Sequence, residues 1–371
     1  MKIKFDTAYD IISAVTAIIL IIALTSGIRS NSITPLIAFL SKTGEKTASA
    51  NEYFNLLFPS LNQNNNQLTS VDRTVYASNP LDTLTVTPED IKQLIESAKA
   101  NASNDVEDGK IIERQYEKST VTTTIGNILV RNNTDTQQKL DLNQFLSAKP
   151  DLKISDKTQP SVLIFHTHTT ESYEMLDRGW YAQDYVTRSN SPDRNMVRVG
   201  VEIKEQLESA GYTVIHDTEI HDVSYNGAYD HSRKSVEEYL KKYPSIKIVL
   251  DIHRDAIEQD DGVRIKPTAT VLGKKAAQIM IITGCQEGKV TDFPNWKQNL
   301  TFALNLQSVC EDMYPGLMRP VYFCQRKYNM DLSPNNLLVE MGSCSNTLEE
   351  AAYSGRLLGS ALVKLLDSNQ G

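Results

Sequence analysis

Side chains that can bind a metal ion or transfer a proton follow three separate apolar runs of the chain. They are His166, His168 and Glu171 after residues 162–165, His253 and Arg254 after residues 248–250, and Glu340 after residues 337–339. Short apolar runs of this kind are typical of buried strands. In an open α/β sheet, ligands bind beyond the carboxyl ends of the strands. The sequence therefore predicts that the three groups meet at one site.

The first group has the composition of a zinc site. His166 and His168 lie two positions apart, so in an extended segment their side chains project to the same face. Zinc is commonly bound by imidazole nitrogens and carboxylate oxygens, and a catalytic zinc ion keeps one coordination position open. Glu171 supplies a carboxylate three residues further on. The alternative is that one of the two histidines is a hydrogen-bonded structural residue.

The second and third groups place charges directly after strongly apolar segments. A charged side chain in such a position needs a partner, because burying an unpaired charge is costly. For Glu340 the partner is a metal ion, an arginine or a water molecule. The alternative is structural: Arg254 pairs with Asp251 or Asp255, His253 only packs, and Glu340 belongs to an ion pair.

Aromatic and basic side chains near residues 225–233 suit the binding of a sugar or an acidic peptide. The candidates are Tyr225, Tyr229 and Arg233, close to the start of a predicted helix. The same residues would equally suit a loop that folds back on the sheet. We assign no ligand role to His216, His221 or His231.

From residue 161 onwards, predicted strands alternate with predicted helices. An example is the amphipathic segment 195–210, which ends before Gly211, a residue expected at a helix C-terminus, and is followed by a short apolar strand. This alternation predicts an α/β fold with a mostly parallel or mixed sheet and helices on both faces. The four cysteines match no C-x-x-C pattern, and we assign them no role.

The chain before residue 161 divides into three parts. Residues 11–28 contain no charge and no proline and are long enough to cross a bilayer. We expect a cytoplasmic tail and transmembrane helix in 1–29, although a cleaved signal peptide is the alternative. Residues 30–85 are rich in Asn, Ser, Thr and Gln and are predicted to be a polar spacer. Residues 86–160 then form a small accessory α+β module, and 161–371 the main domain.

The overall charge excludes one class of partner. The formal net charge is −8 at pH 7, whereas non-specific binding to nucleic acid needs a basic surface. We therefore expect no nucleic acid as a partner. If residues 11–28 anchor the chain in the membrane, everything after about residue 30 is extracytoplasmic.

Four longer strings together resemble the stage II sporulation protein P family. They are VLIFHTHTTESY (162–173), RNMVRVGVEIKEQLESAGY (194–212), YNGAYDHSRKSVEEYLKKYPSIKIVLDIHRDA (225–256) and NLLVEMGSCSNTLEEA (336–351). The resemblance extends from about residue 161 to the C-terminus. The chain is also distantly similar to zinc-dependent N-acetylmuramoyl-L-alanine amidases, which share a strand ending in I-H and a V-E-x-G segment.

This resemblance implies an amidase-like fold and a membrane-anchored peptidoglycan hydrolase of an endospore-forming bacterium. Such an enzyme cleaves the amide bond between N-acetylmuramic acid and the stem peptide, and also cross-links between peptides. It would act between the mother-cell and forespore membranes during engulfment, together with the stage II sporulation proteins D and M.

The resemblance also implies roles for single residues. His253 and Glu340 match the motifs directly, and His168 falls opposite the amidase histidine, although His166 belongs to the family's motif as well. The amidase glutamate at the start of the first helix has no counterpart here, which leaves Glu171 as the candidate for the third ligand.

A mechanism follows from these roles. Zinc bound by one of the two histidines, by Glu171 and by His253 would activate a water molecule. Glu340 would take the proton from that water and return it to the leaving amine. Arg254 would orient Glu340 or stabilise the oxyanion. Two other classes stay open: a non-catalytic scaffold that binds wall peptides or proteins, and a metal-dependent carboxypeptidase acting on the stem peptide.

Overall fold

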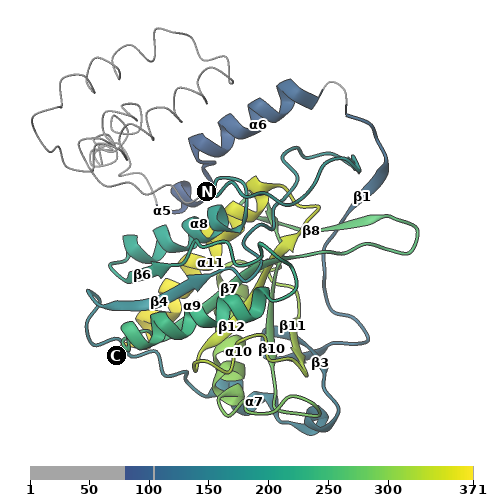
Figure 1. Cartoon of the computed structure of the whole chain (residues 1–371). Coiled ribbons are helices and arrows are strands. Elements are labelled where there is room, and N and C mark those ends of the chain that lie inside the picture. The colour runs from purple at the N-terminus through teal and green to yellow at the C-terminus, as the bar shows by residue number, and fades with distance from the viewer. Residues whose placement is uncertain (1–79, 103–104, 371) are drawn as a thin grey trace, which may run out of the picture. The chain divides into compact units, whose positions relative to one another are not determined.

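Two β-sheets and the helices packed on them make up the part of the chain that the structure describes. The computed structural model describes residues 80–102 and 105–370 (Figure 1). The predicted membrane helix at 11–28 and all but the end of the predicted spacer lie outside the described residues. Within the described ranges, no helix has both the length and the apolar character needed to cross a membrane.

The helices and strands have the following bounds. The helices are α5 (Pro80–Thr85), α6 (Glu89–Asn101), the 3₁₀ helix η3 (Thr136–Lys139), α7 (Leu142–Ser147), α8 (Met196–Ser209), α9 (Ala228–Lys242), α10 (Trp296–Met313) and α11 (Leu348–Ser368). The strands are β1 (Gly109–Arg114), β2 (Thr123–Ile125), β3 (Ile128–Asn133), β4 (Pro160–Phe165), β5 (Trp180–Tyr181), β6 (Thr213–His216), β7 (Ile248–Asp255), β8 (Arg264–Val271), β9 (Lys274–Ala277), β10 (Ile279–Gly284), β11 (Val321–Cys324) and β12 (Asn336–Ser343).

The larger sheet has eight strands in the order β2-β3-β11-β10-β12-β7-β4-β6. Strands β12, β7, β4 and β6 are parallel neighbours, whereas β10 is antiparallel to β12 and β2 is antiparallel to β3. A smaller sheet has the order β5-β1-β8-β9. The prediction of an α/β fold with a mixed sheet is therefore confirmed.

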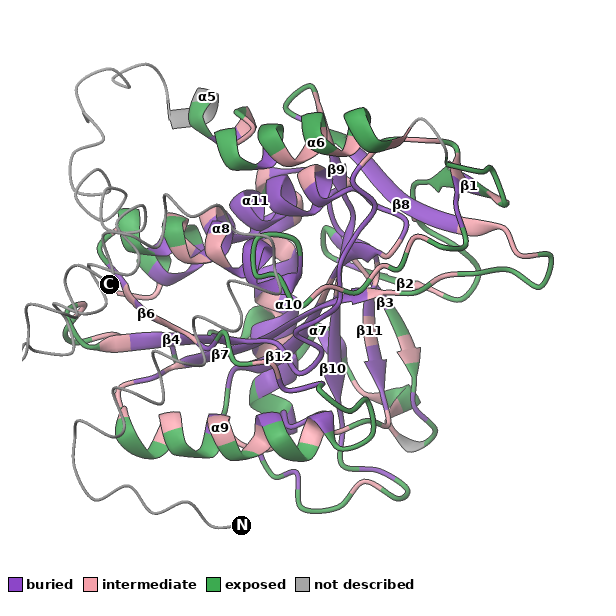
Figure 2. Cartoon of the chain, turned by 45° about the horizontal axis from the view of Figure 1, so that its top comes forward, coloured by how far each residue is buried: buried purple, intermediate pink, exposed green. Residues whose placement is uncertain are grey.

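Helices cover both faces of the larger sheet, as the sequence predicted. On one face, Ile164 and Leu250 lie in the same buried cluster as residues of α8, α10 and α11. On the other face, Leu163 and Val249 pack against Val236 of α9. Figure 2 shows α9 on one side of β4 and β7, and α8 and α11 on the other. Because both faces of the central strands are buried, residues 162–165, 248–250 and 337–339 of these strands are all apolar.

Residues 86–160, expected as a small accessory module, supply strands to both sheets. Strand β1 pairs in parallel with β8 of the smaller sheet, and β3 pairs in parallel with β11 of the larger one. Helix α6 is joined to α8 by an ion pair between Asp90 and Arg198, with 2.8 Å between Oδ2 and Nε. These pairings connect the segment to the strands and helices that follow residue 160.

Helix α11 begins at a cluster of buried polar side chains that follows the end of β12. Thr347 accepts a hydrogen bond from the Glu350 backbone, and Glu350 Oε2 accepts one from the Thr347 backbone at 3.0 Å, which together form a capping box. Glu350 Oε1 lies 2.8 Å from Nζ of Lys266, which is 1% exposed. The start of this helix is thus held to β8 by a buried ion pair.

The four cysteines are free thiols in the described part of the chain, and three of them are buried. Cys310, for example, belongs to the main apolar cluster under α10. These side chains behave as small apolar residues.

Candidate active site

The three groups of polar residues converge at the carboxyl ends of adjacent strands. In the order β12-β7-β4, Glu340 lies directly opposite His253, and Phe165 lies opposite Asp251. His168 and Glu171 follow β4 within a turn. The geometric expectation that the strand ends meet is therefore met for four residues, which we call the central cluster: His168, Glu171, His253 and Glu340.

Asp251 orients His253. The Nε2 atom of His253 lies 2.8 Å from Asp251 Oδ1, while Asp251 also accepts hydrogen bonds from the backbone and hydroxyl of Thr167 at 2.8 and 2.7 Å. The Asp251 contact is a close ion-pair approach without hydrogen-bond alignment, and Nδ1 of His253 lies 3.7 Å from Glu171 Oε2, beyond hydrogen-bonding distance. Burial lowers the pKa of His253, but Asp251 and the other carboxylates outweigh it and raise the pKa to about 9.

His168 faces His253 across the cluster. The two rings meet edge to face with their centroids 5.3 Å apart, and Tyr225 stacks on the outer side of His168 at 4.8 Å. Nδ1 of His168 is buried and has no hydrogen-bond partner within the described residues; its nearest carboxylate, Asp222, is 4.0 Å away. Burial lowers the pKa of His168, which favours the neutral, metal-binding form of the imidazole. Tyr225 thus lies at the site, as predicted.

Two arginines position Glu171. The backbone N–H of Arg254 donates to Glu171 Oε2 at 3.3 Å, and the Arg254 guanidinium lies 3.6 Å from Oε1. Arg188 lies 3.6 Å from the same oxygen and forms a closer ion pair with Asp222 at 2.8 Å. The carboxylate of Glu171 is thereby held between the two arginines and His253.

The role expected for Arg254 needs a correction. Its Nε and Nη2 donate to the backbone carbonyls of Ser172 and Thr187, at 3.1 and 2.9 Å, and Nη1 faces Glu171. The guanidinium projects from β7 towards the loop after β4, because successive side chains of a strand alternate between faces. Arg254 is consequently a positioning residue for Glu171, and no hydrogen bond or ion pair joins it to Glu340 in the described part of the chain.

Glu340 is the residue of the cluster with the most unusual environment. Its Oε2 atom is buried and has no hydrogen-bond partner in the part of the chain that the structure describes. Burial raises the pKa of Glu340 to about 8; Asp255 and Glu171 act in the same direction, against His253 and Arg319. A carboxylate with so high a proton affinity suits general acid–base catalysis near neutral pH.

A sharp turn sets the chain path after Glu340. Gly342 has a φ of +75°, and a Cβ atom there would lie 2.5 Å from Asn346 Oδ1. Asn346 Oδ1 accepts a hydrogen bond from the backbone of Ser343 at 2.9 Å. Only glycine fits this position, which explains the G-S-C-S-N segment that follows the glutamate.

His166 does not join the cluster. Its Nδ1 lies 3.0 Å from the carbonyl oxygen of Ile252, and its Nε2 lies 2.8 Å from Nε2 of His216. The expectation that His166 and His168 share a face fails because the chain turns after Phe165 instead of remaining extended. Since Nδ1 must donate to the carbonyl, Nε2 accepts the proton of His216. Both rings pack against Gly200 of α8, where a Cβ atom would be 2.5 Å from His216.

This histidine pair makes stability depend on pH. Burial lowers the pKa of His216 to about 3 and that of His166 to about 4. The unfolded chain takes up these protons near pH 6.5, so the free energy of unfolding falls as the pH drops below that value. We expect His216→Gln to weaken the pH dependence of the unfolding free energy between pH 6 and 4 by roughly 1.4 kcal/mol per pH unit. Urea unfolding in EDTA at several pH values measures this dependence for the wild type and the variant. An equal pH dependence of the unfolding free energy in the two proteins would contradict the pairing.

Arg233, predicted to bind substrate, is engaged elsewhere. Its guanidinium forms two hydrogen bonds to Asp331, at 3.0 and 2.9 Å, and an ion pair with Glu237 at 3.0 Å. Arg233 therefore joins α9 to the loop before β12 and is not part of the central cluster.

Two contributors to the site were missed by the sequence interpretation, Asp222 and Arg188, which form the ion pair beside Glu171. Both belong to loops, where no periodic pattern marks them. Tyr229, named in the sequence interpretation with Tyr225, packs against both His168 and His253, with centroid distances of 5.6 and 6.4 Å.

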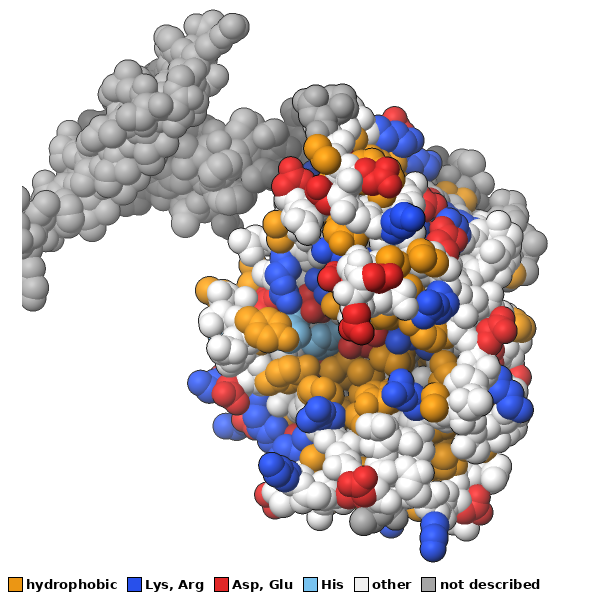
Figure 3. Space-filling model, turned by 90° about the vertical axis from the view of Figure 1, so that its right-hand side faces the viewer, with side chains coloured by type: hydrophobic (Ala, Val, Ile, Leu, Met, Phe, Trp, Pro, Cys, Tyr) orange, Lys and Arg blue, Asp and Glu red, His pale blue; other side chains and the backbone are white. Residues whose placement is uncertain are grey.

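Figure 3 shows histidine and acidic side chains at a hollow of one face of the molecule, next to a gathering of hydrophobic side chains. On the sheet beside Glu340, an apolar group is formed by Met280, Ile282, Tyr322 and Leu338; Met280 lies directly opposite Glu340 on β10. An extended ligand would thus meet an apolar surface next to the acidic and imidazole groups.

Comparison with known proteins places the chain in a family. The family model described as stage II sporulation protein P matches residues 62–363. The stage II sporulation protein P of Bacillus subtilis is 32% identical over 201 residues, which cover 51% of this chain and 47% of that protein. The match therefore spans about half the length of this relative.

Two solved structures of amidases are also similar to this chain. The CwlD amidase from Clostridioides difficile, in complex with the GerS lipoprotein, is 14% identical, and the match covers 56% of this chain and 99% of that chain with a TM-score of 0.35. The N-acetylmuramyl-L-alanine amidase Ami1 from Mycobacterium smegmatis is 9% identical, with 57% and 100% covered and a TM-score of 0.33. On the extent of the family match, the chain belongs to the stage II sporulation protein P family.

Proposed function

We propose that the chain is a zinc-dependent peptidoglycan hydrolase that cleaves the amide bond between N-acetylmuramic acid and the stem peptide. Cleavage of peptide cross-links is included in the proposal as a second activity. The observation that carries it is the central cluster, in which two imidazoles and a carboxylate face each other beside the unpartnered oxygen of Glu340. Membership of the sporulation family supports the choice of substrate.

The residues present fit a zinc ion. His168, Glu171 and His253 provide two nitrogen donors and one oxygen donor, the set that catalytic zinc sites use. His253 is held by Asp251 through its other nitrogen, and a carboxylate in that position is the usual outer partner of a metal-binding histidine. Glu171 and the Nδ1 atom of His253 lie 3.7 Å apart without a hydrogen bond. Glu171 and His253 would therefore hold the ion between them. His168 would complete the set by turning towards it, because the ligand atoms of these three residues do not all lie within 4.8 Å of one another in the described part of the chain.

The remaining residues perform defined steps. Zinc, when bound, supplies a Lewis acid that polarises the scissile carbonyl and makes water a stronger nucleophile near neutral pH. Glu340 Oε2 accepts a proton from the attacking water and returns it to the nitrogen of the leaving amine. Tyr229 and Tyr225 flank the histidines and present ring faces and hydroxyls to the sugar or peptide. The apolar group beside Glu340 excludes water from one side.

Arg254 provides a test of how Glu171 is positioned. We expect Arg254→Gln to raise the zinc concentration needed for half-maximal hydrolysis by about 10- to 100-fold, because the support of the third ligand is lost. The readout is restoration of activity to metal-stripped protein by added zinc. Arg114→Gln is the control, since Arg114 is an exposed arginine on β1. Equal zinc requirements for the two variants would show that Arg254 does not support a metal ligand.

Product analysis distinguishes the proposed function from its rivals. Purified peptidoglycan is incubated with the protein, and the soluble products are identified by mass spectrometry. An amidase releases free stem peptides and leaves glycan strands intact, an endopeptidase separates cross-linked peptides, and a carboxypeptidase removes single terminal amino acids. A scaffold releases nothing while it still sediments with the polymer, and that result would overturn the proposal.

The cellular setting is proposed on the resemblance alone. Residues 11–28 would anchor the chain in the membrane as a single-pass helix with the catalytic domain extracytoplasmic. The enzyme would then act between the mother-cell and forespore membranes during engulfment, with the stage II sporulation proteins D and M as partners.

A further inference from the structure

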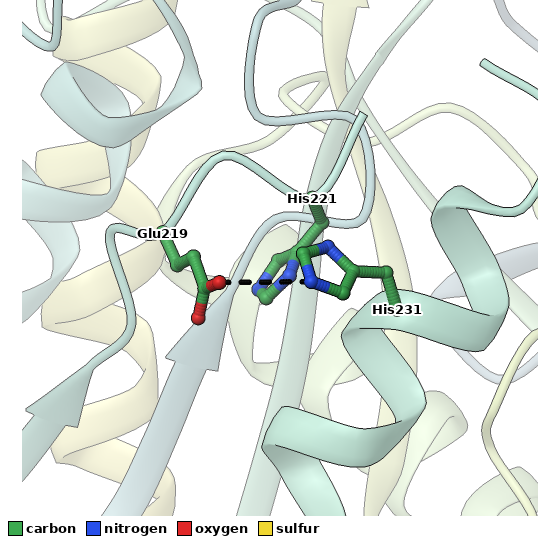
Figure 4. Close-up of side chains that lie close together, drawn as sticks. All are labelled: Glu219, His221 and His231. Carbon is green, nitrogen blue, oxygen red and sulfur yellow. Dashed lines mark ion pairs between the residues drawn. The ribbon is translucent and has the colours of Figure 1, made fainter. Parts of the chain in front are cut away.

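A second group of metal-binding side chains lies outside the central cluster. Glu219, His221 and His231 each offer one ligand atom, and these atoms all lie within 4.8 Å of one another. Glu219 and His221 belong to the loop after β6, whereas His231 is on the first turn of α9 (Figure 4). Segments ten residues apart in the chain thus meet through three side chains of the types that bind zinc.

His221 is prepared to donate a lone pair. It is 2% exposed, and its Nε2 lies 3.1 Å from Asp217 Oδ2. A carboxylate at that distance accepts the Nε2 proton, so Nδ1 of the neutral ring carries a free lone pair. Nδ1 is buried and has no hydrogen-bond partner within residues 80–102 and 105–370. A buried nitrogen without a partner is costly, and a metal ion at this point would satisfy it.

The other two side chains can adjust to an ion. Nε2 of His231 lies 3.6 Å from Glu219 Oε1, which is too long for a hydrogen bond. Their side chains are 48% and 56% exposed, so small rotations are sterically free. Two ligands of one tetrahedral zinc ion lie about 3.3 Å apart, close to the separation already present. The fixed His221 and the two adjustable ligands leave a fourth position for water.

We propose that Glu219, His221 and His231 form a second divalent-metal site of the zinc class. The set of two imidazoles and one carboxylate, with Asp217 behind His221, has the arrangement of a carboxylate–histidine–metal site. Binding fixes the loop after β6 to the start of α9. The site is separate from the proposed catalytic ion and does not depend on the proposed function.

The position of this second site gives it a structural role. The loop that carries Glu219 and His221 is held to the segment after His168: Thr169 Oγ1 donates to the Glu219 carbonyl at 2.8 Å, and the His221 backbone donates to Thr169 Oγ1 at 3.2 Å. The next residue, Asp222, pairs with Arg188 beside the central cluster. A metal ion here therefore stiffens the wall of the catalytic pocket.

Zinc titration of the full chain tests the second site. Metal-free protein is titrated with ZnCl₂ against a chromophoric chelator, and we expect two equivalents to bind. His231→Ala, at an exposed position that tolerates truncation, should lose one equivalent, or bind it at least tenfold more weakly, and keep the other. His168→Ala should lose the other equivalent and keep the one at the second site. Glu238→Ala, an exposed change on the same helix, is the control and should bind both.

Hydrogen exchange provides a second readout at the loop itself. Zinc should slow exchange of backbone amides in residues 217–227 at least tenfold in wild-type protein and in His168→Ala, but not in His231→Ala. Unchanged stoichiometry and affinity in His231→Ala would overturn the second site. A wild-type stoichiometry of one equivalent that His231→Ala abolishes and His168→Ala leaves unchanged would count against the catalytic zinc and leave the second site intact.

Discussion

Replacing Glu340 with glutamine is expected to lower the rate of peptidoglycan hydrolysis by about 10²–10⁴-fold, the usual contribution of a general acid–base residue. Glutamine preserves the size of the side chain but cannot accept a proton. The buried Oε2, free of hydrogen bonds to the rest of the described chain, becomes an amide or carbonyl group without basicity. The measurement is the initial rate of soluble peptide release from purified peptidoglycan.

The Glu340 variant also requires controls for folding and metal content. Glu238→Gln removes an exposed carboxylate from α9 and should hydrolyse at the wild-type rate. Both variants should bind as much zinc as the wild type, because Glu340 is not among the proposed ligands. Substantial hydrolysis by Glu340→Gln would remove this residue from the mechanism. Loss of zinc with loss of activity would make it a ligand instead.

The largest expected effect on stability comes from Lys266→Met. Lys266 is 1% exposed and pairs with Glu350 at 2.8 Å and with Asp177. Methionine fills a similar volume but leaves Glu350 buried without its counter-charge, at the N-terminus of α11. Removing one partner of a buried ion pair costs about 3–5 kcal/mol. Urea unfolding of metal-free protein at pH 7 should show a corresponding decrease in the unfolding free energy.

A neighbouring lysine provides the matched control for Lys266→Met. Lys275 pairs with the same Asp177 at 2.8 Å but is 36% exposed, so Lys275→Met should cost no more than about 1 kcal/mol. Adding Glu350→Gln to Lys266→Met should restore part of the loss, since the uncompensated charge is gone and glutamine keeps the capping box. Equal effects of the two single lysine variants would contradict a special role for the buried pair.

The site could be predicted from sequence where strands determine it. His253 and Glu340 are strand residues, and parallel pairing of neighbouring strands brings them opposite each other. The apolar runs before them identified these strands. The rule that ligands bind beyond the carboxyl ends of strands then placed the two residues at one site. His168 lies in the central cluster and His166 does not, and this difference depends on a turn that the H-T-H pattern does not reveal.

Other parts of the site depend on contacts across long sequence separations. Arg254 and Arg233 are paired with residues 83 and 98 positions away, Glu171 and Asp331. Local sequence patterns contain no information on such partners. A charged residue next to a motif is therefore interpreted as part of that motif even when its partner lies elsewhere. The sequence interpretation did not predict the group of Glu219, His221 and His231 for a similar reason. The three side chains meet only because the loop after β6 folds back against the start of α9.

Strands from residues 86–160 illustrate the same limit at the level of the fold. The sequence indicates a helix at 88–100 and strand-forming segments after it, and the structure has both, as α6 and as β2 and β3. Which sheet a short strand joins is decided by partners such as β11, nearly two hundred residues later. Composition and periodicity cannot specify that pairing.

The coordination of zinc in the crystalline protein is the most direct test of the proposed catalytic centre. An anomalous difference map recorded at the zinc absorption edge locates each bound ion and the atoms that bind it. We expect a peak bound by His168, Glu171 and His253, with Glu340 close by but not coordinated. A map without density among these three side chains, from protein that is active and zinc-loaded, would contradict the proposed centre.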